Sequence, residues 1–423
     1  MNKIEFYKET NFKQTPIGKI TEDWNVRKLE DIVEKIKAGG TPLTTNKEYW
    51  NGNIPFVKIE DITAASKYLV KTAVSISKKG LENSNAWIVP ENSLLLAMYG
   101  SLGELAINSI PVATNQAILG IIPKNKSDVE FLYYWFSYFK PAWKKFAKPT
   151  TQANLTAEIV KNILVPFPKI EEREVIAWVL SVVDLAIQKT NEIIAKTERL
   201  KKGLMQTLLT KGIGHKEFKD TEIGKIPKTW QIVKIGDVTE TTSGGTPDRS
   251  KKEYYGGTIP WVKSGELKDN TIYDTEEKIT EIGLKNSAAK LLPKGTLLVA
   301  MYGATVGKTG ILGIEATTNQ AVCAILPKHT RLNLKFLQYY IVFGRNRWIL
   351  QSSGGAQPNI SQEIIKNSKI PLPPPEEQQR IANILSIVDE KIELENKKKS
   401  GLEKVKRGLM DLLLTGKVRV KVN

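Results

Sequence analysis

The sequence contains an internal repeat that covers most of its length. The block from Phe12 to Trp24 returns as Phe218 to Trp230, at an offset of 206 residues. Further short motifs follow in the same order at nearly the same offset: Gly-Gly-Thr-Pro at 39–42 and 244–247, Ile-Pro-Phe/Trp-Val-Lys at 54–58 and 259–263, Ala-Met-Tyr-Gly at 97–100 and 300–303, and Thr-Asn-Gln-Ala at 114–117 and 318–321. Because collinear matches of this kind arise by duplication, the chain is expected to fold as two copies of one unit.

Each copy has two parts of different character. The first part separates short β-favouring runs, such as Ser93–Met98 and Thr296–Met301, by Gly, Pro and Asn, which is typical of a β-rich mixed domain. Within it, the aromatic stretch Phe131–Phe139 predicts a buried helix. The second part begins after consecutive prolines and a pair of glutamates, which favour the start of a helix. We therefore expect an α+β chain in four consecutive segments: a mixed domain at 1–168, a long helix at 169–212, a second mixed domain at 213–373 and a second long helix at 374–416.

Both long helices carry apolar residues at alternating steps of four and three. In the first helix these are Ile176, Leu180, Val183, Ile187, Thr190, Ile194, Thr197, Leu204 and Leu208, with Lys201 at one step. In the second they are Ile381, Leu385, Val388, Ile392, Leu402, Leu409 and Leu413, interrupted by Glu395, Lys399 and Lys406. One such stripe is typical of a helix lying on a domain. Two stripes, each near 57 Å at about 1.5 Å per residue, favour pairing as an antiparallel coiled coil.

Charge and composition narrow the partner. The chain has 62 Lys and Arg against 45 Asp and Glu, a net charge of +17, which favours a polyanion. No apolar run reaches the roughly 18 residues of a membrane-spanning helix, and the first residues lack the core of a signal peptide, so we expect a cytoplasmic protein that binds nucleic acid and no membrane. A single cysteine, Cys323, and two histidines leave no ligand set for zinc and no disulfide framework.

The doubled motifs and the doubled proline-rich lead into Glu-Glu and a long helix resemble the specificity subunits of type I restriction-modification enzymes, along nearly the whole chain. The resemblance implies two target recognition domains, each reading one half of a bipartite DNA site, with the paired helices as a spacer. It also implies two modification subunits, which hold S-adenosylmethionine and methylate adenine, and restriction subunits that cleave DNA with ATP and Mg. No cofactor is expected in this chain itself. The charges on the second helix depart mildly from the pattern and favour looser packing or a partner there.

Three motifs resemble catalytic motifs, but each departs from the pattern that the chemistry needs. The run from Gly303 to Thr309 is one residue too short between its glycines for a phosphate-binding loop. The carboxylates Asp248 and Glu266 with Lys268 have the spacing of a metal-dependent nuclease, but the other repeat has Leu43 in place of Asp248 and no Lys after Asp61. The Pro-rich segment at 371–375 does not have the Asn/Asp-Pro-Pro-aromatic order of an adenine methyltransferase. A chain without catalysis of its own is therefore expected.

Duplication also sorts the candidate DNA contacts. Residues shared by both copies are expected to be scaffold or to contact the backbone of DNA, and polar residues that differ are expected to read bases. The shared candidates are Lys58 and Lys263, Tyr99 and Tyr302, Gln152 and Gln357, and Asn154 and Asn359. The differing candidates are Ser101, Arg249, Ser264 and Lys308. Arg249 is the foremost base reader, because its planar fork can bond guanine twice. For each, an ordinary surface, turn or core role is the alternative.

Two rival functions remain at this point. A free-standing DNA-binding regulator would bind its site tightly without partners and direct no methylation with them. An enzyme with an unrecognised site would act as the pure chain. The specificity-subunit hypothesis predicts instead a split, asymmetric site and adenine methylation only once modification subunits are present.

Overall fold

The computed structural model describes residues 4–146, 155–328, 331–350 and 359–421. The chain forms two compact units, Met1–Asn191 with Lys397–Asn423, and Glu192–Asn396. Each unit therefore contains one mixed domain and half of both long helices. The four consecutive segments predicted from the sequence follow the order of the chain, whereas the compact units cut across the helices.

The first unit contains fourteen of the early strands and the short helices around them. Its strands are β1 (Glu5–Lys8), β2 (Phe12–Thr15), β3 (Gly18–Thr21), β4 (Asn25–Lys28), β5 (Val33–Ala38), β6 (Trp50–Val57), β7 (Tyr68–Leu69), β8 (Val74–Ile76), β9 (Ile88–Val89), β10 (Ser93–Ala97), β11 (Leu105–Asn108), β12 (Val112–Thr114), β13 (Ile118–Pro123) and β14 (Leu164–Phe167), together with β27 (Val418–Lys421) from the end of the chain. Its short helices are α1 (Leu29–Ile32), α2 (Ile59–Ala64), α3 (Lys78–Glu82), α4 (Asp128–Phe139), α5 (Trp143–Phe146) and α6 (Ala157–Lys161).

The second unit repeats this plan. Its strands are β15 (Phe218–Thr221), β16 (Gly224–Pro227), β17 (Gln231–Lys234), β18 (Thr239–Ser243), β19 (Tyr255–Val262), β20 (Asn270–Ile272), β21 (Glu277–Ile279), β22 (Leu297–Ala300), β23 (Thr309–Leu312), β24 (Thr317–Thr318), β25 (Val322–Pro327) and β26 (Lys369–Leu372). Its short helices are α8 (Ile235–Val238), α9 (Glu281–Lys285), α10 (Leu334–Leu350) and α11 (Gln362–Asn367).

The sheets of the two units have the same topology. The central five-stranded sheet has the order β5-β13-β10-β11-β7 in the first unit and β18-β25-β22-β23-β20 in the second. A smaller sheet, β8-β6-β12-β9, returns as β21-β19-β24, where the isolated bridge Leu292↔Ala316 takes the place of β9. Strands β10 and β22 are buried on both faces, because the helix α4 or α10 covers one side and the smaller sheet the other. The predicted internal repeat and mixed domains are thus confirmed.

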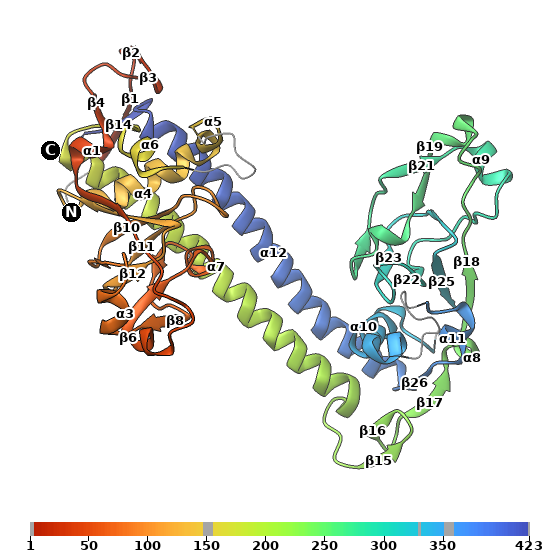
Figure 1. Ribbon diagram of the computed structural model, residues 1–423. Helices are drawn as coiled ribbons and strands as arrows, with labels where there is room; N and C mark the ends of the chain where they lie inside the picture. Colours follow the sequence, from red (N-terminus) through yellow and green to blue (C-terminus); the bar gives the residue numbers. More distant parts are fainter. Residues whose placement is uncertain (1–3, 147–154, 329–330, 351–358, 422–423) are drawn as a thin grey trace. The chain divides into compact units, whose positions relative to one another are not determined.

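The two long helices are α7 (Ile170–Lys211) and α12 (Pro375–Leu414). Every position of the predicted seam is buried or half-buried in both helices. Within each unit the two helices run antiparallel (Figure 1), and an ion pair joins them: Lys406 Nζ to Asp184 Oδ1 in the first unit and Lys201 Nζ to Asp389 Oδ1 in the second, each at 2.6 Å. The predicted antiparallel coiled coil is confirmed, and two of the charges that interrupt its seam are paired across it.

The helix ends are part of the cores of the domains. In the first unit, Ile176 and Leu180 of α7 and Leu413 of α12 lie in one apolar cluster with Trp24 and the aromatic face of α4. The second unit has an equivalent cluster of Trp230 with residues of α7, α10 and α12. The predicted buried helix at Phe131–Phe139 is confirmed as part of α4, eight of whose residues are buried. Each mixed domain is therefore packed directly onto the helix pair within its own unit.

The two ends of the chain meet in the first unit. Strand β1 pairs antiparallel with β27, with Phe6 in register with Val420. Beside this pair the guanidinium of Arg419 bonds Glu172 at 2.7 and 2.9 Å and Asp23 at 2.7 and 3.0 Å. The indole of Trp24 donates to the same Glu172 at 3.1 Å. The first unit is consequently closed by a buried charged cluster drawn from both ends of the sequence.

Candidate nucleic-acid interface

The repeated motifs come together at one end of the central sheet of each unit. In the first unit, Gly-Gly-Thr-Pro follows β5, Met-Tyr-Gly follows β10 and Asn-Gln follows β12. The backbone N–H of Gly40 donates to Thr114 O at 3.0 Å, and that of Met98 donates to Ala117 O at 2.8 Å. A Cβ on Gly39 would lie 1.8 Å from Thr114 O, so these two segments of backbone can approach closely only because residue 39 is glycine.

The second unit builds the same edge from the same residue types. Gly245 donates to Thr318 O at 2.9 Å and Met301 donates to Ala321 O at 2.8 Å. A Cβ on Gly244 would lie 1.9 Å from Thr318 O. The edge formed by residues 39–41, 98–101 and 115–117, or 244–246, 301–304 and 319–321, is called the motif edge below.

An exposed glutamine stands on each motif edge. In the first unit the hydroxyl of Thr41 donates to Gln116 Oε1 at 2.5 Å, and Gln116 also hydrogen-bonds Tyr99. In the second unit Thr246 makes the same bond to Gln320. An oriented side-chain amide offers donors and an acceptor to phosphate or to a base edge. We did not select these glutamines from the sequence. Their identity in both copies, within a polar break between β-runs, is the signal that could have found them.

The shared lysines lie beside the motif edge. Strand β6 runs parallel to β12 with Val57 opposite Thr114, so Lys58 leaves the sheet next to Asn115. In the second unit the N–H of Asn319 donates to Val262 O at 3.0 Å, immediately before Lys263. Lys58 is exposed, which suits a contact to phosphate. The structure therefore brings the tyrosine and lysine candidates of each copy to one place, next to the glutamine of the motif edge.

Arg249 and Lys263 share one acidic partner. The guanidinium of Arg249 bonds Glu277 at 2.6 Å and lies over the rings of Tyr255 and Trp261, at 4.5 and 4.9 Å from their centroids. The ammonium of Lys263 bonds Glu277 at 2.9 Å. Hydrogen bonds from Arg249 and Lys263 lower the pKa of Glu277, so its carboxylate stays charged. Arg249 must exchange this carboxylate for a base edge in order to read DNA.

Among the described residues, this cluster around Glu277 occurs in the second unit alone. The 205-residue offset places Thr44 where the second unit has Arg249. The strand register places Val74, opposite Phe56, where the second unit has Glu277, opposite Trp261. The two motif edges thus share a scaffold and differ in the charges that border it.

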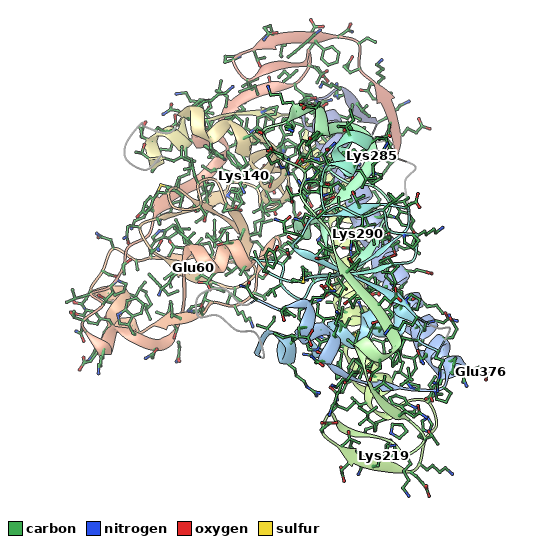
Figure 2. The ribbon with its side chains drawn as sticks, turned by 90° about the vertical axis from the view of Figure 1, so that its right-hand side faces the viewer. Glu60, Lys140, Lys219, Lys285, Lys290 and Glu376 are labelled. Carbon is green, nitrogen blue, oxygen red and sulfur yellow. The ribbon has the colours of Figure 1, made fainter. Side chains whose placement is uncertain are left out.

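The turn after the Met-Tyr-Gly motif differs in charge between the units. In the first, Glu104 bonds Lys140 at 2.6 Å; Lys140, labelled in Figure 2, lies just after α4. In the second, Lys308 stands at the equivalent position and bonds Asp269 at 3.1 Å, which also pairs with Arg345 at 2.5 Å. Burial alone would raise the pKa of Asp269, but the hydrogen bond from the Thr309 N–H and the charge of Arg345 outweigh it, and the pKa is lowered.

The remaining sequence candidates have mixed positions. Ser101 is half-buried on the first motif edge, and Ser264 begins a short 3-10 turn after Lys263. Tyr302 is 37% exposed, and Asn359 is exposed next to Ile360, whose N–H donates to Met301 O at 2.7 Å. Gln152, Asn154 and Gln357 lie outside the described residues.

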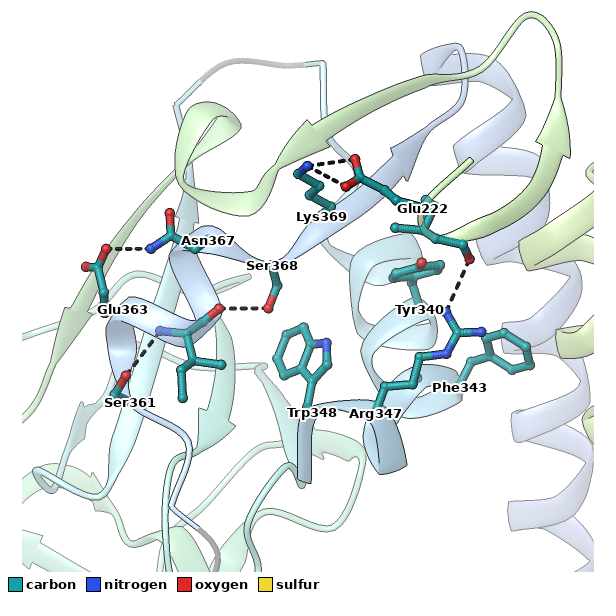
Figure 3. Close-up of a pocket in the computed structure, with 13 residues that line it drawn as sticks. Glu222, Tyr340, Phe343, Arg347, Trp348, Ser361, Glu363, Asn367, Ser368 and Lys369 are labelled. Carbon is teal, nitrogen blue, oxygen red and sulfur yellow. Dashed lines mark hydrogen bonds and ion pairs between the residues drawn. The ribbon is translucent and has the colours of Figure 1, made fainter. Parts of the chain in front are cut away.

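A cavity of about 470 Å³ lies in the second unit between α10, α11 and the β15–β16 hairpin (Figure 3). Aromatic side chains including Tyr340 and Trp348 line it. Its polar groups bind one another: Lys369 bonds Glu222 at 2.6 Å, and Arg347 donates to Ile223 O at 3.2 Å. These internal bonds indicate a structural junction.

Residues 4–146, 155–328, 331–350 and 359–421 contain no group of three or more His, Cys, Asp or Glu side chains placed to hold a metal ion. In the same ranges no helix is both long enough and apolar enough to span a bilayer.

Comparison with known proteins decides the family. The model of the type I restriction modification DNA specificity domain matches the chain twice, at residues 21–199 and 227–404. The chain belongs to the specificity subunits of type I restriction enzymes. The subunit is similar to two relatives from Methanocaldococcus jannaschii. It is 31% identical to the putative MjaX specificity subunit, over 99% of both chains, and 32% identical to the MjaVIII specificity subunit, over 99% of this chain and 98% of the relative.

A solved structure shares the fold of the subunit. The S subunit of the type I restriction-modification system from M. genitalium aligns with a TM-score of 0.61 at 16% identity, over 92% of this chain and 96% of that one. The two matches of the family model each contain one motif edge and part of one long helix. The resemblance inferred from the doubled motifs is thereby confirmed.

Proposed function

We propose that this specificity subunit reads a split, asymmetric DNA site, one half with each motif edge, and directs adenine methylation and cleavage by partner subunits without catalysis of its own. The observation that carries this proposal is the pair of equivalent edges with different bordering charges. One edge has Thr44, Val74 and Glu104, and the other has Arg249, Glu277 and Lys308 at the corresponding places. Two copies of one scaffold with different polar groups suit two different half-sites.

The partners are two modification subunits, which supply S-adenosylmethionine, and restriction subunits, which use ATP and Mg in the cytoplasm. Exposed apolar residues on the long helices support docking of such partners. Trp178, Val182 and Leu185 of α7 are 53%, 48% and 50% exposed, at steps of four and three residues on one helix face. In the second unit Ile387 and Leu394 of α12 are 64% and 62% exposed. Apolar side chains in such a row are typical of a surface that another helix covers.

The test is a methylation map. The subunit is expressed together with its modification subunits in a host that lacks adenine methylation, and methylated adenines are located by long-read sequencing. We expect one motif made of two unlike half-sites separated by a fixed gap. A continuous or palindromic motif would contradict the proposal. Tight site binding with no methylation would favour the free-standing regulator instead.

Arg249 and Lys58 are expected to fail in different ways. The Arg249→Ala variant should lose about 1–3 kcal/mol of discrimination at one position of one half-site. Lys58→Ala should weaken binding to all sequences and reduce the slope of log K against log salt by about one. Fluorescence titration with duplexes mutated in either half measures both effects. Glu277→Gln is the matched control, because it removes the acidic partner and leaves Arg249 in place. If Arg249→Ala loses discrimination equally in both half-sites, Arg249 does not read a base.

The exposed apolar row is expected to bind the modification subunits. The double variant Val182→Glu with Ile387→Glu should weaken assembly at least tenfold, because two charges would be buried in an apolar contact. Analytical ultracentrifugation of the mixed subunits measures this, and Lys196→Glu, at an exposed position of α7, is the control. DNA binding by the double variant alone should not change. Undiminished assembly would place the docking surface elsewhere.

A further inference from the structure

A partly buried polar network joins three helices in the first unit. Asp184 of α7 uses both carboxylate oxygens: Oδ2 accepts from the hydroxyl of Tyr134 in α4 at 2.7 Å, and Oδ1 pairs with Lys406 of α12 at 2.6 Å. Tyr134 is fully buried, and Lys67 donates to its hydroxyl oxygen at 2.9 Å. One carboxylate thus ties the recognition domain to both long helices.

The second unit contains the same network. Asp389 Oδ2 accepts from the hydroxyl of Tyr339 in α10 at 2.7 Å, and Oδ1 pairs with Lys201 at 2.6 Å. Tyr339 is 3% exposed and lies within 3.2 Å of the hydroxyl of Ser386. Here the aspartate belongs to α12 and the lysine to α7, the reverse of the first unit. The networks are therefore related by the internal two-fold repeat.

Apolar seam contacts alone do not choose one register for two helices, because a heptad repeat looks alike after a slide of seven residues. The networks remove that freedom. A slide of seven residues would bring Lys406 opposite Ala177 or Asn191 and take it away from Asp184. Because an unpaired charge in a half-buried seam is unfavourable, only the observed register satisfies both lysines and both aspartates.

The tyrosines connect the domain of each unit to this helix register. Burial is the main cause that raises the pKa of Tyr134 and of Tyr339, so both hydroxyls keep their protons and act as donors. Each aspartate has one oxygen for the domain and one for the other helix. A rotation of α4 or α10 on the helix pair would break the tyrosine bond as well as the apolar contacts that surround it.

We propose that Tyr134–Asp184–Lys406 and Tyr339–Asp389–Lys201 are positioning networks that fix each recognition domain on the helix pair and so hold the DNA gap to one length. The inference rests on the proposed function, since a gap has meaning only if each unit reads one half-site. The six residues touch no DNA. They act through the placement of the motif edges.

The test compares gap tolerance in variants that keep their fold. The quadruple variant Asp184→Leu, Lys406→Leu, Asp389→Leu, Lys201→Leu replaces both ion pairs by apolar residues, a change that buried pairs often tolerate without loss of stability. Each variant is expressed with its modification subunits, and methylation is counted at sites with the native gap and with gaps one base pair shorter or longer. We expect methylation at the altered gaps to rise at least tenfold relative to the native gap, with both half-site sequences unchanged.

A second variant guards against misfolding. Tyr134→Phe with Tyr339→Phe removes only the two hydroxyls and should broaden the gap in the same direction by a smaller factor, about threefold. Lys78→Leu with Glu82→Leu, which removes an exposed ion pair of α3, is the control and should keep the single gap. A folded quadruple variant that keeps one gap, or one that methylates no site, overturns the inference. If the wild-type subunit directs methylation of a DNA motif that is not split, the proposed function is refuted instead.

Discussion

Replacing Arg419 by methionine is expected to lower the free energy of unfolding of the first unit by about 3–5 kcal/mol, the usual cost of removing one partner from a buried ion pair. The side chains of Arg419 and Glu172 are 8% and 6% exposed. Without the guanidinium, Glu172 would keep chiefly its hydrogen bond from Trp24 and would remain a buried charge with no cation beside it. The variant also loses the bond to Glu9 and the bonds to Asp23, of which the Asp23 bonds contribute less because that side chain is 61% exposed.

Urea unfolding, followed separately for each unit, measures this loss. Arg407→Met is the control, because Arg407 is exposed on α12, the helix that precedes β27, and its replacement should change the stability by less than about 0.5 kcal/mol. His215 takes the corresponding place in the second unit, where it bonds Glu377 at 2.8 Å. His215→Ala should therefore shift only the second unit, by about 1 kcal/mol. A loss below about 1 kcal/mol in Arg419→Met would show that the two chain ends are not closed by this cluster.

Lengthening both long helices by four residues is expected to lengthen the gap in the DNA site by one or two base pairs. Four residues add about 6 Å of rise and about 40° of rotation to a helix. Two base pairs add about 7 Å and about 70° of twist, so rise and rotation nearly agree. Seven residues add about 10 Å with about 20° of opposite rotation, which does not match the twist of DNA, and that variant should methylate weakly at every gap.

The ion pairs show where the insertions belong. The repeat offset of 205 residues matches Lys196 with Gly401, but the helices are antiparallel. Because Lys201 faces Asp389, moving five residues back to Lys196 corresponds to moving five forward to Leu394. Insertions at these two sites lie between the two networks on both helices and keep the register on either side. Methylation mapping should show methylation at sites with the native gap reduced at least tenfold, and methylation at sites with the longer gap in its place. An unchanged gap in a folded variant would mean that the helices only dock the modification subunits.

The sequence was sufficient for every feature that depends on periodicity or repetition. The steps of four and three residues predicted both long helices and their seam, and the doubled motifs predicted two equivalent domains. These features are local or are repeated at a constant offset, so each can be recognised without knowing which segments meet. The family resemblance followed from the same motifs.

Features that depend on tertiary contacts could not be predicted from the sequence. Arg249 reads as a free loop residue until the register of β19 with β21 places Glu277 beside it. Lys201 and Lys406 read as defects of the seam until the antiparallel arrangement supplies their aspartates. Gln116 was visible as part of a repeated motif, but its place on an exposed edge depends on where three separate strands end.

The pairing of β1 with β27 has a consequence for synthesis. The second unit is one continuous stretch, Glu192–Asn396, whereas the first needs Lys397–Asn423 as well. A ribosome therefore completes the second unit while the domain it made first still lacks its last strand, Arg419 and the apolar residues at the end of α12. Until they emerge, Glu172 has no cation and one side of the core around Trp24 stays open. Of the two domains, the one that leaves the ribosome first is the last to finish folding, and during that interval its open apolar core is exposed to aggregation.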